Sequence, residues 1–172
     1  MPQIATAGGS MSAQASFVHA ASAVAIGGRA LLIEGPPGCG KSSLALALID
    51  RGAALIGDDA VTLTPSGEQL IASPPPNIAG LIELRGVGLV RLPVAEPAMA
   101  ALVLELGRES GERLPETPLP RRMIGGVAVP VLRFDPGSVA PAQRAEWALA
   151  LHGLPVHLPV DSPSLAAQSE RE

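Results

Sequence analysis

A glycine-rich loop between an apolar run and a helix-like segment constrains the fold of this chain more than any other feature. It follows the pattern G-x-x-x-x-G-K-S and consists of Gly35, Pro36, Pro37, Gly38, Cys39, Gly40, Lys41 and Ser42. The apolar run 30–33 precedes the loop and the segment 43–49 follows it, in the strand–loop–helix order that the motif requires. Glycines allow backbone N–H groups to turn inward, and the helix N-terminus contributes the positive end of its dipole. The sequence therefore predicts a phosphate-binding loop in an α/β domain.

Individual residues of the loop have separate expected roles. Lys41 is expected to reach the terminal phosphates of a nucleotide, and the Ser42 hydroxyl to hold a magnesium ion. Ser43, at the start of the helix, completes the predicted nucleotide-binding set formed with the loop residues. The pair Pro36-Pro37 either stiffens the loop for binding by restricting φ or only forms the turn. Cys39 is either a redox switch or, as we favour, a small side chain turned away from the phosphates.

The composition limits the classes to which the protein can belong. With 47% hydrophobic and 16% charged residues among 172, the chain is expected to form one domain with a substantial core. A net charge of −4 and a single lysine argue against a nucleic-acid surface or an anionic membrane surface. The single cysteine excludes an intrachain disulfide framework. Because no apolar run is long enough for a membrane span and no signal-peptide pattern is present, we expect a cytoplasmic protein.

Turn-forming and apolar residues predict the organisation of the chain. We expect a flexible N-terminus at 1–15, a folded domain at 16–152 and a disordered tail at 153–172. Charged residues and prolines at 107–122 predict a long surface loop. Apolar patterns predict strands at 22–26, 30–33, 53–57, 60–64, 69–72, 81–84, 88–90, 101–106 and 127–132, and helices at 41–51 and 141–151.

An acidic pair, Asp58-Asp59, follows the strand that returns from the first helix. A helix of about 11 residues rises about 16 Å away from the loop, and about six extended residues return about 20 Å. The pair is therefore expected beside the bound phosphates. Because adjacent strand residues point to opposite faces, one carboxylate is expected to act as a general base toward a hydroxyl and the other to assist a metal. Without the phosphate loop, the same pair would more simply mark a turn.

Four sequence elements occur in a specific order along the chain: His19, the Gly35–Ser42 loop, Ile56-Gly57-Asp58-Asp59-Ala60-Val61 and Glu83-Leu84-Arg85-Gly86-Val87-Gly88-Leu89. Together they resemble the catalytic domain of HPr kinase/phosphorylase. Their order and approximate spacing match the family over His19 to about Leu132, and the last element looks like its glutamate-hydrophobic-Arg-Gly-hydrophobic-Gly signature. The resemblance implies a P-loop kinase domain with a mixed central sheet, similar to the nucleotide-binding core of phosphoenolpyruvate carboxykinase. It also implies the short bacterial form, which lacks the N-terminal domain of the long members.

The resemblance implies specific roles for the acidic residues and the loop. Asp58 matches the base that takes the proton of a substrate serine, and Lys41 matches the lysine at the transferred phosphate. Asp59 and Glu83 match acids near the metal, beside Ser42. A strand-end acid is the simpler interpretation of Glu83.

The resemblance assigns roles to basic residues as well. His19 matches a histidine that orients Asp58 or touches phosphate, although a lone histidine at a strand entrance is more often a surface or capping group. Arg113 matches an arginine on a mobile loop near the transferred phosphate, and Arg85 lies in the signature turn. Taken singly, such arginines, Arg91 included, are more often solvated or paired with an acid.

The activity that the resemblance implies is phosphorylation of a serine of HPr, the small phosphocarrier of the phosphotransferase system, with ATP and Mg²⁺ (or Mn²⁺). Family members also catalyse a phosphorolytic reversal that uses phosphate and releases pyrophosphate. The family hexamer implies a homo-oligomer, although the segment 133–138 differs from the family's Pro-Gly-Arg-Asn-like stretch.

Two other functions use the same loop. One is a small-molecule kinase or simple NTPase, and the other is a nucleotide-sensing module that binds without transfer. Small-molecule kinases usually carry an arginine-rich lid, which residues 107–122 do not resemble. A pure sensor would not need Asp58 as a base.

Overall fold

The computed structural model of the chain describes residues 14–107 and 113–156. Expectations that concern 1–13, 108–112 and 157–172 lie outside the described residues. The elements in chain order are β1 (Phe17–His19), β2 (Ser22–Ile26), β3 (Arg29–Glu34), α1 (Lys41–Asp50), β4 (Ala54–Gly57), β5 (Val61–Ser66), β6 (Gln69–Ser73), β7 (Leu81–Leu84), β8 (Gly88–Arg91), β9 (Ala98–Leu106), β10 (Arg121–Ile124), β11 (Val127–Phe134) and α2 (Pro141–His152).

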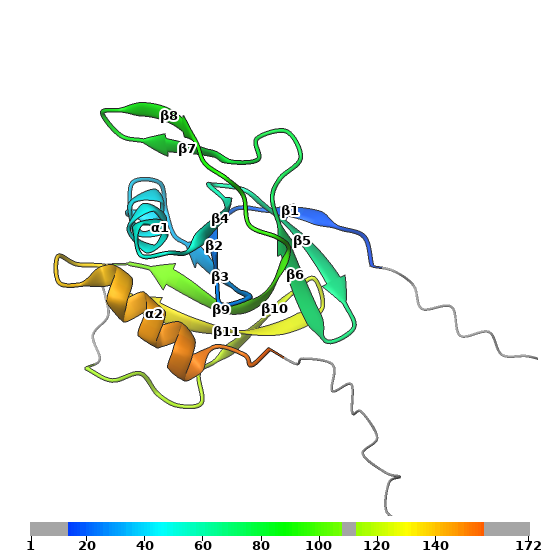
Figure 1. Ribbon diagram of the computed structural model, residues 1–172. Helices are drawn as coiled ribbons and strands as arrows, with labels where there is room; N and C mark the ends of the chain where they lie inside the picture. Colours follow the sequence, from blue (N-terminus) through cyan, green and yellow to red (C-terminus); the bar gives the residue numbers. More distant parts are fainter. Residues whose placement is uncertain (1–13, 108–112, 157–172) are drawn as a thin grey trace, which may run out of the picture.

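Nine strands of the described residues form one mixed sheet, in the order β1-β5-β6-β9-β3-β2-β4, with β11 on β9 and β10 on β11. β3, β9 and β11 run parallel to one another, and the other neighbours are antiparallel. β9 takes two partners along one edge, because its first residues pair with β6 and its last with β11. The sheet is curled, so that Phe17 of β1 lies against Gly125 in the β10–β11 turn (Figure 1).

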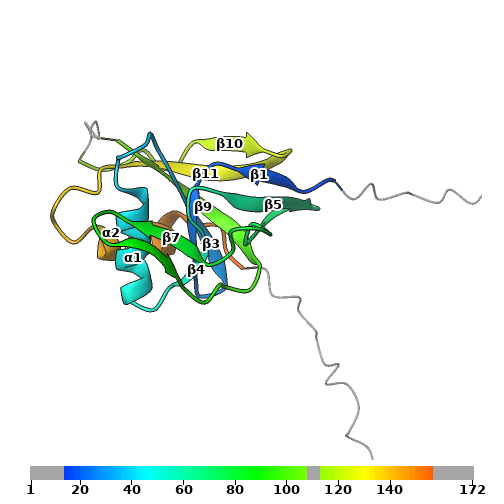
Figure 2. The same ribbon diagram turned by 90° about the horizontal axis from the view of Figure 1, so that it is seen from above.

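The core has two apolar layers, one on each face of the sheet. β3 contributes to both, since Leu31 and Ile33 point to one face and Leu32 to the other. The first layer includes Leu48 of α1 and Leu149 of α2, and both helices cover this face (Figures 1 and 2). Burial on two faces explains why β3 and β9 are continuous apolar runs instead of alternating ones.

Most of the predicted elements are confirmed within a few residues, and the differences have physical causes. Pro65 and Ser66, predicted in a turn, end β5, because the reversal needs only Gly67 and the residue after it. β1 and β10 were not predicted. They have three and four residues, and pairing across the curled sheet stabilises them where local propensity does not. β10 occupies the end of the predicted 107–122 loop.

The folded part of the chain extends beyond the predicted boundary at 152. The Leu154 N–H donates to the Ala101 carbonyl over 2.9 Å, and the Leu154 side chain packs against the helix-side core. Arg29 Nη1 donates to the Leu149 carbonyl over 3.2 Å, so the end of α2 lies beside the start of β3. Over the described residues, no helix is both long and apolar enough to cross a membrane.

Candidate functional site

The predicted phosphate loop connects the end of β3 to α1, as expected. Gly38 and Gly40 have φ values of 78° and 100°, a region that glycine adopts without steric cost. Lys41 Nζ donates to the carbonyl oxygens of Gly35 over 2.9 Å and Pro36 over 3.2 Å, so the lysine folds back onto its own loop. The Lys41 ammonium group is therefore held beside the loop. There, the phosphate oxygens of a polyphosphate could take the place of the two carbonyl oxygens as its hydrogen-bond acceptors.

The Cys39 side chain lies on the inner side of the loop. A Cβ atom placed on Gly35 would come within 2.6 Å of Cys39 Sγ, and the half-buried cysteine packs against the helix-side core. This agrees with the interpretation of Cys39 as a small packing residue.

The Asp58 carboxylate lies at the N-terminal end of α1, where the lengths of the helix and the returning strand predicted it. Ser42 Oγ donates to Asp58 Oδ1 over 2.7 Å, and Ser22 Oγ donates to the same oxygen over 2.9 Å. The Glu83 N–H donates to Asp58 Oδ2 over 3.2 Å. The side chain is only 7% exposed. Contacts from β2, α1 and β7 therefore converge on one buried carboxylate.

The backbone after β4 explains how Asp58 reaches this position. Along the β2–β4 ladder Val24 pairs with Leu55 but Ala23 with Gly57, so a bulge at Ile56 shifts the register by one residue. At Gly57 a Cβ atom would collide with the carbonyl oxygen of Ala60, so the turn requires glycine. Asp59 follows in the left-handed region with φ 61°. The turn buries Asp58 against α1 and leaves Asp59 exposed.

The two predicted metal-side acids are placed differently from Asp58. Asp59 and Glu83 are both exposed, and Glu83 contacts Asp58 through its main chain. Among the residues described, no three or more His, Cys, Asp or Glu side chains gather into a group that could hold a metal. The Ser42 hydroxyl lies beside the turn that carries Asp59, and the Glu83 main chain contacts the same turn. A hydroxyl and carboxylates are oxygen donors of the kind that Mg²⁺ prefers, and this ion usually completes its shell with water and substrate phosphates. The residues therefore fit a magnesium ion held jointly with a nucleotide.

His19 contacts a different acid from the one suggested by its sequence position. His19 Nε2 donates to Glu34 Oε1 over 2.7 Å, and Arg122 pairs with Glu34 Oε2. Glu34 directly precedes the loop, and its side chain is 13% exposed. The ion pair therefore connects β1, β3 and β10 where the curled sheet meets the loop. In this arrangement Ser22 and Ser42 donate hydrogen bonds to Asp58, whereas His19 donates to Glu34.

Burial raises the pKa of the Glu34 carboxyl. Hydrogen bonds from His19 and Arg122, together with the charges of these two residues, lower the pKa by more than burial raises it, so the pKa lies below its ordinary 4.5. The Glu34 carboxylate therefore stabilises the fold at pH values above its ordinary pKa. This stabilisation is lost as the pH falls through the pKa of the folded state. We predict that Glu34→Gln lowers the free energy of unfolding by about 1–3 kcal/mol at pH 7. The deficit should shrink as the pH falls below 4.5.

Urea unfolding of both proteins between pH 7 and pH 3 measures this difference. Glu146→Gln is the matched control, because Glu146 pairs with Arg51 at a more exposed position, where solvent screening makes an ion pair contribute less to stability. A deficit for Glu34→Gln that stayed constant down to pH 3 would contradict the assignment.

The two predicted arginines lie in different surroundings. The Arg85 guanidinium lies over the loop, since a Cβ atom on Gly38 would be 3.9 Å from Arg85 Nη2. Arg113 is exposed and directly follows 108–112. Within 14–107 and 113–156, no hydrogen bond or ion pair joins Arg113 to Asp58, Lys41 or His19. The structure therefore brings Arg85 to the loop.

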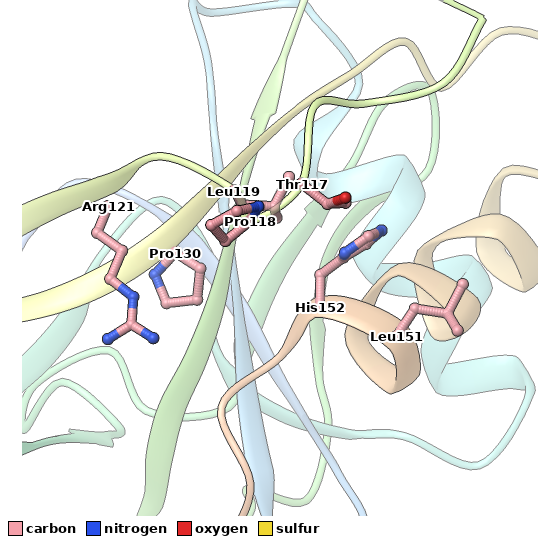
Figure 3. A pocket seen from close by; sticks show the side chains of 7 residues that line it. All are labelled: Thr117, Pro118, Leu119, Arg121, Pro130, Leu151 and His152. Atoms are coloured by element: carbon pink, nitrogen blue, oxygen red, sulfur yellow. The ribbon is translucent and has the colours of Figure 1, made fainter.

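A cavity of about 350 Å³ lies apart from this site (Figure 3). It is bounded by the segment before β10, by β10 and β11, and by the end of α2. Its lining residues are Thr117, Pro118, Leu119, Arg121, Pro130, Leu151 and His152. None of the predicted site residues lines it, so it does not contribute to the phosphate-loop site.

Sequence reasoning missed three polar residues that the structure places at the site: Ser22, Glu34 and Arg122. Ser22 reaches Asp58 only because of the bulge at Ile56, which no local pattern indicates. Arg122 reaches Glu34 across 88 positions of sequence. The position of Glu34 directly before the loop was the one available signal, since a half-buried acid at a strand end usually needs a partner.

Comparisons with known proteins match the same part of the molecule. The family model of the HPr serine kinase C-terminal domain matches residues 10–95, half of the chain. The HPr kinase/phosphorylase of Clostridium botulinum (strain Eklund 17B / Type B) is 46% identical over 67 residues, which cover 39% of this chain and 22% of that protein. The HPr kinase/phosphorylase of Acidovorax sp. (strain JS42) is 38% identical over 119 residues, covering 62% of this chain and 36% of that protein.

A solved structure extends the similarity to the fold. The HPr(Ser) kinase/phosphatase of Coxiella burnetii superposes with a TM-score of 0.67 at 29% identity, covering 78% of this chain and 94% of that chain. The curated relatives are longer, and the matched region spans between about a fifth and about a third of their length. The matched residues include His19, the phosphate loop, Asp58 and the β7–β8 hairpin. The chain therefore belongs to the family of the HPr serine kinase C-terminal domain.

Proposed function

We propose that the protein is an ATP- and Mg²⁺-dependent kinase that phosphorylates a serine of an HPr-type phosphocarrier. The observation that carries the proposal is the buried Asp58 carboxylate, which accepts a hydrogen bond from the Ser42 hydroxyl at the end of the loop. Membership of the family and the activity named for its relatives support the choice of acceptor.

The phosphate loop is assigned to the nucleotide. We propose that the loop 35–43 binds the β- and γ-phosphates of ATP through the Lys41 ammonium and through its backbone N–H groups, which all its residues except Pro36 and Pro37 possess. The proposed core is a P-loop kinase core like that of phosphoenolpyruvate carboxykinase. Ser42, Asp59 and Glu83 are the residues that would hold Mg²⁺ or Mn²⁺, which neutralises phosphate charge when bound. The lysine contacts at Gly35 and Pro36 support this assignment, because they keep the ammonium group beside the loop.

Asp58 is assigned to the acceptor. The serine Oγ attacks the γ-phosphorus, the bond from that phosphorus to the bridging oxygen breaks, and ADP leaves. The proton of the serine hydroxyl passes to the Asp58 carboxylate. In phosphorolysis, inorganic phosphate attacks the phosphoserine phosphorus, the serine oxygen takes the proton back from Asp58, and pyrophosphate is released.

The basic residues around the loop complete the proposal. Arg85, which lies over Gly38, is suited to neutralise charge on the transferred phosphoryl group. Arg113 has the same proposed role, as the family resemblance implies. The half-buried His19 is assigned to the phosphate side of the site, held there by Glu34.

Intact-mass measurement tests the function directly. The full chain is incubated with ATP and Mg²⁺ together with one of three acceptors: an HPr-type protein, an unrelated serine-containing protein, or a pool of small hydroxyl compounds. We expect a mass increase of one phosphoryl group on the HPr-type protein alone. Phosphorylation confined to a small molecule, ATP hydrolysis without an acceptor, or ATP binding without turnover would each contradict the proposal.

A further inference from the structure

We propose that Ser22 is a positioning residue that holds the Asp58 carboxylate and the Asp59 backbone in the geometry needed for transfer. The inference rests on the proposed function, because it names a further residue of that same site. Ser22 lies at the start of β2 and has no exposed surface. A buried hydroxyl without a partner would cost free energy, so its hydrogen bonds decide its role.

Ser22 Oγ makes two contacts, each with one residue of the acidic pair. It donates to Asp58 Oδ1 over 2.9 Å and accepts from the Asp59 N–H over 3.4 Å. The hydroxyl therefore connects the side chain of one acid to the main chain of the next. The Asp59 contact supports a backbone with φ 61°, which is strained for any residue other than glycine.

The direction of the Ser22 side chain follows from the strand. Val24, two residues further along β2, packs in the helix-side core, so Ser22 points to the same face and toward α1. The bulge at Ile56 places Ala23 opposite Gly57, and Ser22 and Asp58 come next on their strands. Without the bulge, Ser22 would follow opposite Gly57, which has no side chain to receive the hydrogen bond.

Two hydroxyl groups bind the same oxygen of Asp58, but they differ in what else they do. Ser42 belongs to the phosphate loop, and the proposed function gives its hydroxyl a second task at the nucleotide. Ser22 lies on β2, outside the loop, and has no exposed surface with which to contact a ligand. Ser22 is therefore the donor that keeps the carboxylate in place whether or not nucleotide is bound, and it acts through Asp58.

Steady-state kinetics of Ser22→Ala and Ser22→Cys test the inference, with Ser73→Ala as the matched control. Ser73 is a strand serine whose hydroxyl donates to the Thr62 carbonyl, and Ser73 makes no contact with Asp58. We expect kcat to fall about tenfold in both Ser22 variants, with the KM for ATP changed less than about twofold, since one hydrogen bond to a charged group is lost. Ser73→Ala should match the wild type. Full activity in Ser22→Cys would show that the transfer rate depends on the volume of the side chain at position 22 and not on its hydroxyl group. That result would overturn the inference.

A double-mutant cycle with Asp58→Asn separates positioning from a general loss of stability. If Ser22 acts through Asp58, then Ser22→Ala should lower kcat by less than about twofold in the Asp58→Asn background. A full tenfold loss there would overturn the role. In NMR spectra, the Asp58 carboxyl carbon and the Asp59 amide should shift in Ser22→Ala and stay in place in Ser73→Ala; unchanged signals would equally overturn it.

The outcomes distinguish this inference from the function on which it rests. Transfer by the wild type together with an unchanged rate in Ser22→Ala would refute the role of Ser22 and leave the proposed function standing. No transfer by the wild type to any acceptor would refute the proposed function and, with it, any role of Ser22 in that reaction.

Discussion

Replacing Asp58 by asparagine is expected to lower kcat for phosphoryl transfer by about 100-fold or more, because a carboxamide cannot take the proton of the acceptor hydroxyl. Binding of ATP should stay within about threefold of the wild type, since the loop itself is unchanged. Asparagine suits this test better than alanine. Its NH₂ group can donate to the Ser22 and Ser42 hydroxyls while its oxygen accepts the Glu83 N–H.

Transfer is measured from the initial rate of phosphorylated acceptor, and ATP binding by calorimetry with the same preparations. The control is Asp50→Asn, because Asp50 is exposed at the C-terminal end of α1, whereas the Asp58 carboxylate lies at the N-terminal end of that helix. Its rate should equal that of the wild type. If Asp58→Asn kept more than half of the wild-type kcat, Asp58 would not be the base.

Replacing Lys41 by alanine is expected to weaken both ATP binding and transfer. Loss of a charge-assisted contact to the phosphates should raise the Kd for ATP about 10- to 100-fold and lower kcat further, because negative charge grows during transfer. The fold should persist, since Lys41 bonds only two loop carbonyls, those of Gly35 and Pro36. Calorimetric titration with ATP gives the Kd and coupled ADP release gives kcat.

Arg51→Ala is the matched control for Lys41→Ala. It removes a positive charge just after the C-terminal end of α1, the helix that Lys41 begins, and breaks an exposed pair with Glu146. ATP affinity should not change in this variant. Equal weakening in both variants would mean that net charge, and not a contact at the loop, determines binding. An unchanged Kd in Lys41→Ala would remove the lysine from the nucleotide site.

The centre of the site could be predicted because its geometry is local. The loop fixes the start of α1, and the lengths of that helix and of β4 return the chain to the same level, so Asp58 had to lie close to Ser42. The two apolar faces of β3 made the strand equally recognisable. These features depend on chain lengths and periodicities that are visible in the sequence.

The remaining contacts could not be predicted because they depend on register and on closure of the sheet. One extra residue at Ile56 decides that Ser22 meets Asp58, and a bulge has no reliable local signature. Arg122 and His19 meet at Glu34 only because the sheet curls to bring β1 and β10 toward the end of β3. His19 was expected to orient Asp58 or to touch phosphate, and its contact with Glu34, the residue that precedes the loop, was not predicted.

We propose that the phosphate loop and Asp58 together transfer the γ-phosphoryl group of ATP to a serine of an HPr-type protein. A time course with γ-labelled ATP tests this transfer by comparing that acceptor with a variant whose acceptor serine is replaced by alanine. We expect label on the serine form, none on the alanine form, and little free labelled phosphate. Equal labelling of both forms, or label released as free phosphate at the same rate without either protein, would contradict it.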